Sequence, residues 1–179
     1  MSLVADIIAQ DPVGMEQLRA ARALGLTDWC IAAGFVRNRV WDHLHGISPP
    51  RPPADIDVLY YDADDLSKEV EARHEARLDA LMPGLPWQVR NQARMHLKNG
   101  DPPYAGTADA IRYWLETCTA IAVRLEPDDR MSLIAPYGLD DLFALVCRPT
   151  PAGLHRAEAY RARVTVKAWH RRWPECRIE

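Results

Sequence analysis

Two carboxylates one residue apart are the feature of this sequence that most directly suggests chemistry. They lie in Ala54-Asp55-Ile56-Asp57-Val58-Leu59-Tyr60-Tyr61, whose apolar residues predict a strand. Side chains alternate between the faces of a strand, so Asp55 and Asp57 share one face while Ile56 turns into the core. Neighbouring carboxylates repel each other unless a cation holds them, and such oxygen ligands suit Mg²⁺ or Mn²⁺. A metal bound there would neutralise charge during phosphoryl or nucleotidyl transfer.

A glycine stands where an apolar run turns into a helix. Residues 29–33 predict a buried strand, and the apolar spacing from Phe35 to Leu44 predicts the helix. At this turn Gly34 would let a phosphate approach the backbone, and the helix N-terminus would supply N–H donors. Alone, Gly34 could be a tight structural turn and the acid pair an ordinary strand end. Their combination favours the binding of a nucleoside triphosphate.

Residues 87–97 alternate with a period of two and predict a strand with one polar face. Its side chains would be Gln88, Arg90, Gln92, Arg94 and His96. Arginine binds phosphate bidentately and histidine can act as a base, so this face is a candidate cleft wall with Arg94 as the expected phosphate contact. The alternative is a face that the C-terminal helices cover and whose polar groups pair internally.

The remaining pattern predicts a mixed α+β protein with a mostly antiparallel or mixed sheet flanked by helices. The other expected elements are two short helices broken at Asp11-Pro12, a helix over 68–82, a helix near 107–116, a hairpin over 118–135, a short helix over 138–145 and a basic helix over 155–173. We expect one compact domain: helices at 1–26 packed on a core at 27–147, followed by a basic helical segment at 148–179.

Composition limits the classes to which the protein can belong. The 179 residues are 48% hydrophobic and 26% charged, which is typical of a soluble globular domain and excludes a disordered, collagen-like or coiled-coil chain. No run approaches the roughly 20 apolar residues of a membrane span. The N-terminus lacks the pattern of a secretion signal, and the four cysteines include no C-x-x-C pair. We therefore expect a cytoplasmic protein with free thiols and no membrane partner.

Charge is distributed unevenly along the chain. Residues 148–179 hold eight Arg or Lys against three Glu, a net charge of +5, which leaves −8 for the rest of a chain whose net charge is −3. A basic helix beside an acidic body can contact nucleic acid. The alternative is a solvated amphipathic helix whose charges pair with the body.

The glycine turn and the acid pair together resemble a known family. Ala33-Gly34-Phe35-Val36-Arg37-Asn38, followed after 16 residues by Asp55-Ile56-Asp57-Val58, is similar to the start of the nucleotidyltransferase fold of the DNA polymerase β superfamily. The motif is closest to that of the tRNA CCA-adding enzymes and poly(A) polymerases. The segments 91–96 and 135–142 further resemble an uncharacterised bacterial nucleotidyltransferase-like family, over about residues 15–175.

This resemblance implies a polymerase-β-like fold with C-terminal helices and a metal-dependent enzyme. The enzyme would move a nucleoside monophosphate from a nucleoside triphosphate to an unknown hydroxyl acceptor. By the same resemblance, Asp55 and Asp57 would hold Mg²⁺ or Mn²⁺, Gly34 would contact the triphosphate, and Arg37 would lie near phosphate or serve the packing of the motif.

The sequence departs from the family pattern at three points. Ala33 stands where the first glycine of a pair is expected, Asn38 replaces an acid, and no third carboxylate is evident on a later strand. These departures favour a second hypothesis, a degenerate, non-catalytic nucleotide-binding or regulatory module. A third hypothesis is an RNA- or protein-binding domain that uses the basic C-terminal helix.

Overall fold

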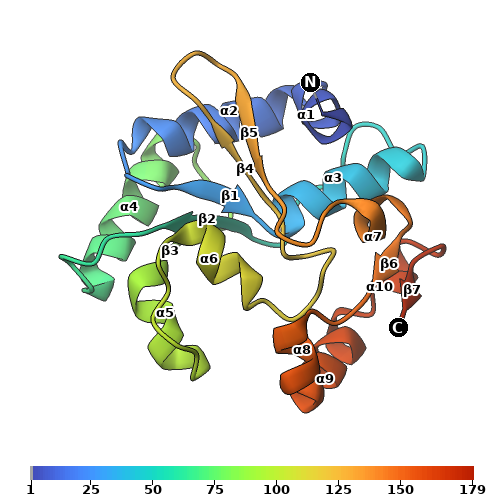
Figure 1. Cartoon of the computed structure of the whole chain (residues 1–179). Helices are drawn as coiled ribbons and strands as arrows, with labels where there is room; N and C mark the ends of the chain where they lie inside the picture. The colour runs from blue at the N-terminus through green and yellow to red at the C-terminus, as the bar shows by residue number, and fades with distance from the viewer. Residues whose placement is uncertain (1) are drawn as a thin grey trace.

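A five-stranded sheet organises the computed structural model, which describes residues 2–179 (Figure 1). The strand order is β3-β2-β1-β4-β5. The strands are β1 (Cys30–Ala32), β2 (Ile56–Tyr60), β3 (Trp87–Asn91), β4 (Ala122–Leu125) and β5 (Met131–Ile134). Strands β2 and β3 are parallel, and the other neighbouring pairs are antiparallel. The α+β class with a mixed sheet is therefore confirmed.

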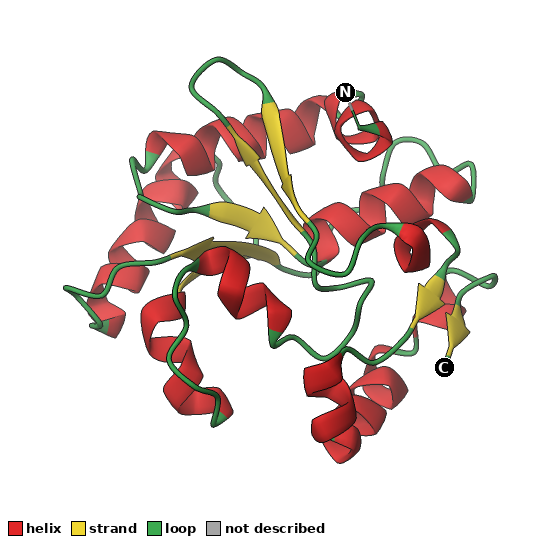
Figure 2. Cartoon of the chain, viewed as in Figure 1, coloured by secondary structure: helices red, strands yellow, loops and turns green. Residues whose placement is uncertain are grey.

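Helices surround this sheet, and a two-stranded parallel ladder follows it near the C-terminus (Figure 2). The helices are α1 (Leu3–Ala9), α2 (Pro12–Ala23), α3 (Gly34–Leu44), α4 (Lys68–Leu81), α5 (Gln92–Asn99), α6 (Thr107–Arg112), α7 (Asp140–Phe143), α8 (Pro151–His155), α9 (Ala157–Lys167) and α10 (Trp169–Arg172); the ladder strands are β6 (Val146–Cys147) and β7 (Arg177–Ile178). None of the helices within residues 2–179 combines the length and apolar character that a membrane crossing requires.

The two faces of the sheet are buried unequally. One face joins apolar side chains of α2, α3 and α4 in the main core, where Ile31, Val58 and Val89 are fully buried. The other face carries a smaller cluster that includes Cys30, Ala32, Leu59 and Ala122, and α6 covers part of it. Asp57 is only partly buried on this second face, because neighbouring side chains alternate across β2. The thinly covered face is thus the one that carries Asp57, whereas Asp55 lies just before the first residue of β2, outside the strand that the sequence predicted for both acids.

The expected strand over 87–97 is wrong beyond Asn91, where α5 begins. The Asn91 side chain accepts a hydrogen bond from the Ala93 amide at 3.0 Å and donates to the carbonyl oxygens of Asp62 and Asp65. This is a helix N-cap, and it competes locally with continuation of the strand. Gln92, Arg94 and His96 therefore do not share a strand face with Arg90.

The expected basic helix over 155–173 is divided into α9 and α10, with α8 in front of them. Ala168 ends α9 in the left-handed region, at φ 43°. Trp169 and Trp173 then enter the main core, and the Trp173 indole N–H donates to Asp42 Oδ1 at 2.8 Å. Residues 148–179 are therefore packed into the body of the protein by their aromatic side chains.

Candidate active site

The site lies where β1 ends and β2 begins. The antiparallel register pairs Ala32 with Asp57, so the carboxyl end of β1 and the amino end of β2 meet at one edge of the sheet. Beyond Ala32 the chain turns through Ala33 into α3, which begins at Gly34. The same register carries this turn toward Asp55. The structure therefore brings together the glycine turn and the acid pair, which the sequence places about twenty residues apart.

Ala33 has a backbone conformation that favours glycine. Its φ of 55° and ψ of −119° lie outside the regions that L-residues normally adopt. Hydrogen bonds hold it there: its N–H donates to Ile121 O at 2.9 Å, and its carbonyl accepts from Val36 and Arg37. Such strain costs about 1–3 kcal/mol. This conformation gives a physical reason why the family pattern has a glycine where this chain has Ala33.

Gly34, in contrast, is not required by the chain's own geometry. A Cβ built there would lie 3.4 Å from Asn38 Nδ2 and 3.6 Å from Arg37 Nη2, which is ordinary contact. The sequence left open that Gly34 serves only a tight turn. The unusual backbone conformation of this turn is at Ala33, so a structural requirement for glycine exists at position 33 and not at position 34. Gly34 itself is buried, and the amides of Val36 and Arg37 donate to the Ala33 carbonyl.

Asp57 lies in an environment that disfavours its ionised form. Burial raises its pKa to about 6, and the neighbouring Asp55 charge adds to this, whereas Arg163, Lys167 and Arg90 act in the opposite direction. A cation beside the pair would relieve both the desolvation and the repulsion. The carboxylate pair thus has the electrostatic character of a divalent-metal site.

The donor set fits Mg²⁺ only as a partial set of ligands. Within residues 2–179, no group of three or more His, Cys, Asp or Glu side chains is arranged to hold a metal ion. Mg²⁺ commonly takes one or two carboxylates and completes its shell with water and substrate phosphates. Asp55 and Asp57 match that pattern. The third carboxylate, which is not evident in the sequence, is not supplied by the described tertiary structure either.

Arg37 lies in the first turn of α3, and its side chain is buried. It donates from Nη1 to Thr119 Oγ1 at 2.7 Å and from Nη2 to Asn38 Oδ1 at 2.9 Å. Its guanidinium carbon is 4.8 Å from the centre of the Trp169 ring. Burial lowers its pKa. Of the two roles that the resemblance allows, these contacts favour packing of the motif, and Asn38 serves as a partner of Arg37.

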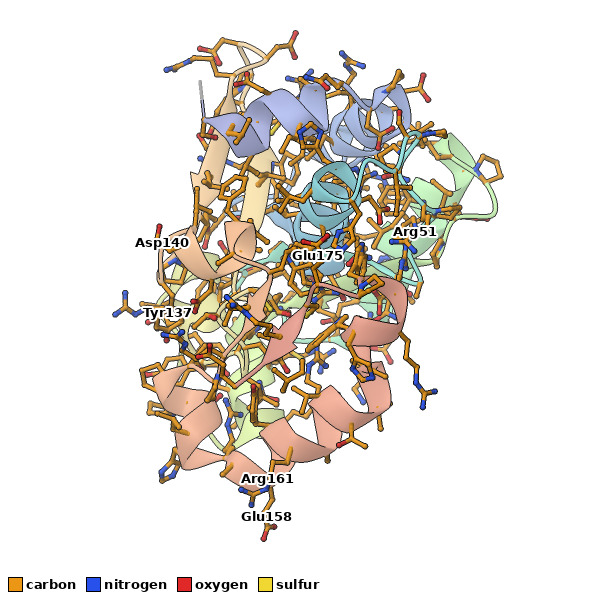
Figure 3. The ribbon with its side chains drawn as sticks, turned by 90° about the vertical axis from the view of Figure 1, so that its right-hand side faces the viewer. Arg51, Tyr137, Asp140, Glu158, Arg161 and Glu175 are labelled. Carbon is orange, nitrogen blue, oxygen red and sulfur yellow. The ribbon has the colours of Figure 1, made fainter. Side chains whose placement is uncertain are left out.

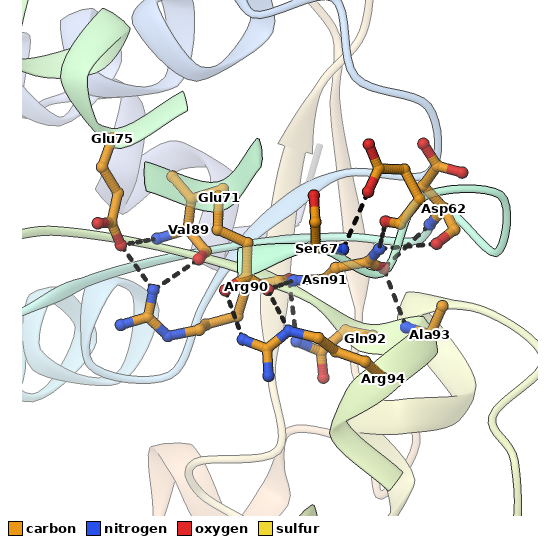
Figure 4. A network of polar contacts seen from close by, with 11 residues as sticks. Asp62, Ser67, Glu71, Glu75, Val89, Arg90, Asn91, Gln92, Ala93 and Arg94 are labelled. Atoms are coloured by element: carbon orange, nitrogen blue, oxygen red, sulfur yellow. Dashed lines mark hydrogen bonds and ion pairs between the residues drawn. The ribbon is translucent and has the colours of Figure 1, made fainter. Parts of the chain in front are cut away.

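The polar residues around the end of β3 form a separate network of ion pairs (Figure 4). Arg94 donates from Nε to Glu71 Oε1 at 2.8 Å, and Arg90 donates from Nη1 to Glu75 Oε1 at 2.6 Å. This network lines a groove of about 340 Å³ between α4 and α5. Two of the predicted cleft residues belong to this network. The charge of Arg90 also lowers the pKa of Asp57, whereas Arg94 forms an ion pair with Glu71.

The other two predicted cleft residues make local contacts. Gln92 donates to the Arg90 carbonyl at 3.2 Å. The His96 ring meets the Tyr104 ring edge to face, with centroids 5.9 Å apart. Both follow from the start of α5 at Gln92, which takes these side chains off the face of the sheet.

Three further charged residues belong to the surroundings of the site, and the sequence reasoning did not find them. Glu116 is 1% exposed, between α6 and β4, and its Oε1 lies 2.7 Å from Arg163 Nε of α9. Arg163 and Lys167, four residues apart in α9, both lower the pKa of Asp57. The i, i+4 spacing was visible in the sequence, but the ion pair of Arg163 with Glu116 depends on the fold.

The comparison that decides the family covers most of the chain. A sequence model described as "Nucleotidyltransferase" matches residues 19–178. The chain belongs to this nucleotidyltransferase family. Among curated proteins, none matches the sequence.

Solved structures place this nucleotidyltransferase with one particular architecture. It is similar to an NMR structure described as a CCA-adding enzyme head domain, with 34% identity and a TM-score of 0.88 over 98% of this chain and 94% of the other. A CCA-adding enzyme with CTP is 20% identical, with a TM-score of 0.62 over 100% of this chain. The Thermotoga maritima CCA-adding enzyme with tRNA is 19% identical, with a TM-score of 0.61 over 98% of this chain. The nucleotidyltransferase spans only 44% and 42% of those two enzymes, which share its fold.

Proposed function

We propose that this nucleotidyltransferase binds a nucleoside triphosphate with Mg²⁺ at the edge formed by Gly34, Asp55 and Asp57, and transfers a nucleoside monophosphate to a hydroxyl acceptor. The observation that carries the proposal is the pairing of Ala32 with Asp57, which sets the start of α3 beside the amino end of β2. CCA-adding enzymes of the same fold have been solved with CTP and with ATP, which supports a nucleotide ligand.

Each part of the site has a distinct role in this proposal. The backbone at Gly34 and the positive end of the α3 dipole bind phosphate oxygens. Asp55 and Asp57 would hold the metal, which when bound supplies charge neutralisation on the triphosphate. In the reaction an acceptor hydroxyl loses its proton to water and its oxygen attacks the α-phosphorus, while the bond from that phosphorus to the bridging oxygen of the β-phosphate breaks and pyrophosphate leaves. The residues of the chain thus orient the triphosphate for this displacement.

One observation favours a second function, that of a non-catalytic nucleotide-binding module. The described residues offer no third carboxylate near Asp55 and Asp57. In related chemistry a carboxylate positioned beside the acceptor hydroxyl takes its proton. A protein without one could bind the nucleotide and still fail to transfer it. Binding and transfer therefore have to be measured separately.

Thermal unfolding tests the binding site first. The wild type and Asp57→Asn are unfolded with each of ATP, CTP, GTP and UTP, with and without Mg²⁺. A ligand at 100 times its Kd stabilises the folded state by about 2.7 kcal/mol, so we expect a Mg²⁺-dependent rise in Tm that Asp57→Asn loses. Asp64→Asn, an exposed acid in the loop after β2, is the matched control and should keep the rise.

Release of pyrophosphate distinguishes the two functions. It is measured with the triphosphate that binds, in the presence of short RNA or small alcohols as acceptors. Release that Asp57→Asn abolishes supports the transferase. Binding without release for any acceptor supports the non-catalytic module. The absence of a Mg²⁺-dependent rise with all four triphosphates would overturn the proposed site itself.

A further inference from the structure

The loop that leads from α3 into the acid pair is rich in proline. Its sequence over residues 47–53 is Ile-Ser-Pro-Pro-Arg-Pro-Pro, and Asp55 follows two residues later. A proline ring fixes its own φ at about −65° and confines the residue before it to extended conformations. Arg51, Pro52 and Pro53 are all restricted in this way. Such a segment acts as a semi-rigid spacer, so the position of Arg51 is transmitted along the chain toward Asp55.

Arg51 is anchored on a buried carboxylate of α3. Its backbone N–H donates to Asp42 Oδ2 at 2.8 Å, and its side-chain Nε donates to Asp42 Oδ1 at 2.9 Å. The Asp42 side chain is 0% exposed. Charge-assisted hydrogen bonds of this kind are strong and directional. Because both the backbone and the side chain of Arg51 bind the same carboxylate, the backbone of the loop is fixed at this residue.

The C-terminal segment closes the other side of this anchor. The Trp173 indole N–H donates to the same Asp42 oxygen that accepts from Arg51 Nε. The Arg51 guanidinium also donates to the Arg172 carbonyl at 3.2 Å, and its central carbon lies 5.1 Å from the centre of the Trp173 ring. Arg51, which is labelled in Figure 3, is thus held between α3 and the end of α10.

Asp55 lies between this anchor and the first residue of β2. Ile56 is a second fixed point, because it is buried and its N–H donates to the Pro86 carbonyl at 2.9 Å. Asp57 lies inside the strand, where it pairs with Ala32. Asp55 precedes the residues of β2 that pair with β1 and β3. Its position therefore depends on the spacer as well as on the strand.

We propose that Arg51 is a positioning residue that holds Asp55 where it can share a divalent cation with Asp57. It acts through the spacer over residues 52–54, and its own position is set by Asp42. The inference rests on the proposed function and deepens it, since it names a residue outside the site on which the metal pair depends. Replacing residues that orient the ligands of a metal commonly lowers its affinity by about 10–100-fold.

Two matched proline substitutions test the spacer. Pro52→Gly lies between Arg51 and Asp55, whereas Pro50→Gly lies on the other side of Arg51. Both enlarge the unfolded ensemble in the same way, so both should lower Tm to a similar extent. The Kd of Mn²⁺ alone is measured by electron paramagnetic resonance. Pro52→Gly should weaken Mn²⁺ binding about tenfold, and Pro50→Gly should bind Mn²⁺ as the wild type does.

The mobility of Asp55 is measured in the metal-free protein. With EDTA present, backbone ¹⁵N relaxation gives the order parameter of each amide. The value for Asp55 should be near the rigid limit of about 0.85 in the wild type and in Pro50→Gly, and should fall toward about 0.6 in Pro52→Gly. Equal values in the two variants would show that the spacer does not hold Asp55.

The anchor is tested with a double variant. Arg51→Met alone leaves Asp42 buried without its cation, which can prevent folding, so Asp42→Asn is combined with it. This double variant should weaken Mn²⁺ binding about as much as Pro52→Gly does. Since anchor and spacer act in series, adding Pro52→Gly to the double variant should weaken binding no further. A further tenfold loss in the triple variant would show that Arg51 does not act through the spacer.

The outcomes separate this inference from the proposed function. Asp55→Asn should lose Mn²⁺ binding if the acid pair is the metal site. If it does, but Pro52→Gly and the double variant bind Mn²⁺ as Pro50→Gly does, Arg51 is not a positioning residue and the proposed site stands. If the wild type binds no Mn²⁺, or Asp55→Asn binds it equally well, the metal pair of the proposed function is wrong and this inference is wrong with it.

Discussion

Ala33 and Gly34 differ in what the structure requires of them, although the family pattern has glycine at both positions. Ala33 holds the strained backbone of the turn, with φ at 55°, and Gly34 keeps the start of α3 free of a side chain. The chain itself leaves room for a Cβ at position 34, so packing does not require a glycine there. The same turn thus contains one residue under backbone strain and one glycine that neither backbone strain nor packing requires.

Two single substitutions should separate these roles. Gly34→Ala should change the free energy of unfolding by less than about 1 kcal/mol, since alanine suits a helix start and meets only ordinary contacts. It should weaken triphosphate binding by about tenfold or more, because a methyl group blocks the backbone donors. Ala33→Gly should raise stability by about 1 kcal/mol, the strain relieved less the entropy that glycine adds to the unfolded chain.

Urea unfolding and calorimetry measure these effects. Equal binding by Gly34→Ala and the wild type would show that phosphate does not approach this turn. A loss of stability in Ala33→Gly would show that the backbone at Ala33 is not under strain.

Asp57 should make the metal-free protein less stable at neutral pH than at mildly acidic pH. Its folded-state pKa is raised from 3.8 to about 6. The folded protein therefore binds the proton first as the pH falls, so the penalty is full above pH 6 and disappears toward pH 4. With EDTA present, Asp57→Asn should be more stable than the wild type by about 1–2 kcal/mol at pH 7.5, and the difference should vanish near pH 4. Unfolding by urea across this range measures it. A variant less stable than the wild type at pH 7.5 would contradict the raised pKa.

At the scale of elements, the junction of β3 and α5 changes the surroundings of the site most. Asn91 caps α5, and its own N–H donates to Glu71 Oε1 at 2.7 Å. Glu71 also accepts a hydrogen bond from Arg94. One buried acid of α4 therefore binds both the end of β3 and the first turn of α5. The junction explains why the alternating pattern over 92–97 does not continue the strand.

Arg94→Met tests whether this arginine is structural or binds phosphate. Removing it leaves Glu71 buried without its cation, which should cost about 3–5 kcal/mol of stability. Adding Glu71→Gln to the variant should recover part of that loss, and the exposed Arg73→Met on α4 should change stability little. If Arg94 serves structure alone, the triphosphate Kd of the folded variant stays at the wild-type value. A Kd weakened tenfold would instead make Arg94 a phosphate contact, as the sequence led us to expect.

At the scale of the whole molecule, the C-terminal segment completes both the core and the surroundings of the site. Trp173 packs edge to face on Trp41 of α3, with ring centroids 5.1 Å apart, and bonds to the buried Asp42. Several of its basic residues pair with acids of the body: Arg148 with Asp141, Arg156 with Asp101, Arg163 with Glu116 and Arg172 with Asp42. These pairs favour the interpretation that the +5 segment compensates the acidic body.

The sequence by itself determined the α+β class, the helix after Gly34, the strand β2 at the acid pair and the hairpin of β4 and β5. These features are encoded locally, by side-chain periodicity, by turn residues and by a short motif whose spacing is fixed. The free thiols were also predictable, and Cys30, Cys118, Cys147 and Cys176 are all free and buried.

Only the tertiary structure decided which charged residues pair with one another. Arg94 and Lys167 are both basic residues of helices, and nothing in their local sequence distinguishes a guanidinium paired with Glu71 from an ammonium exposed to solvent. That distinction depends on contacts between residues far apart in the chain, such as Arg163 with Glu116 and Trp173 with Asp42. Such contacts arise from the packing of whole elements, and the periodicity of a single segment contains no information about its partners.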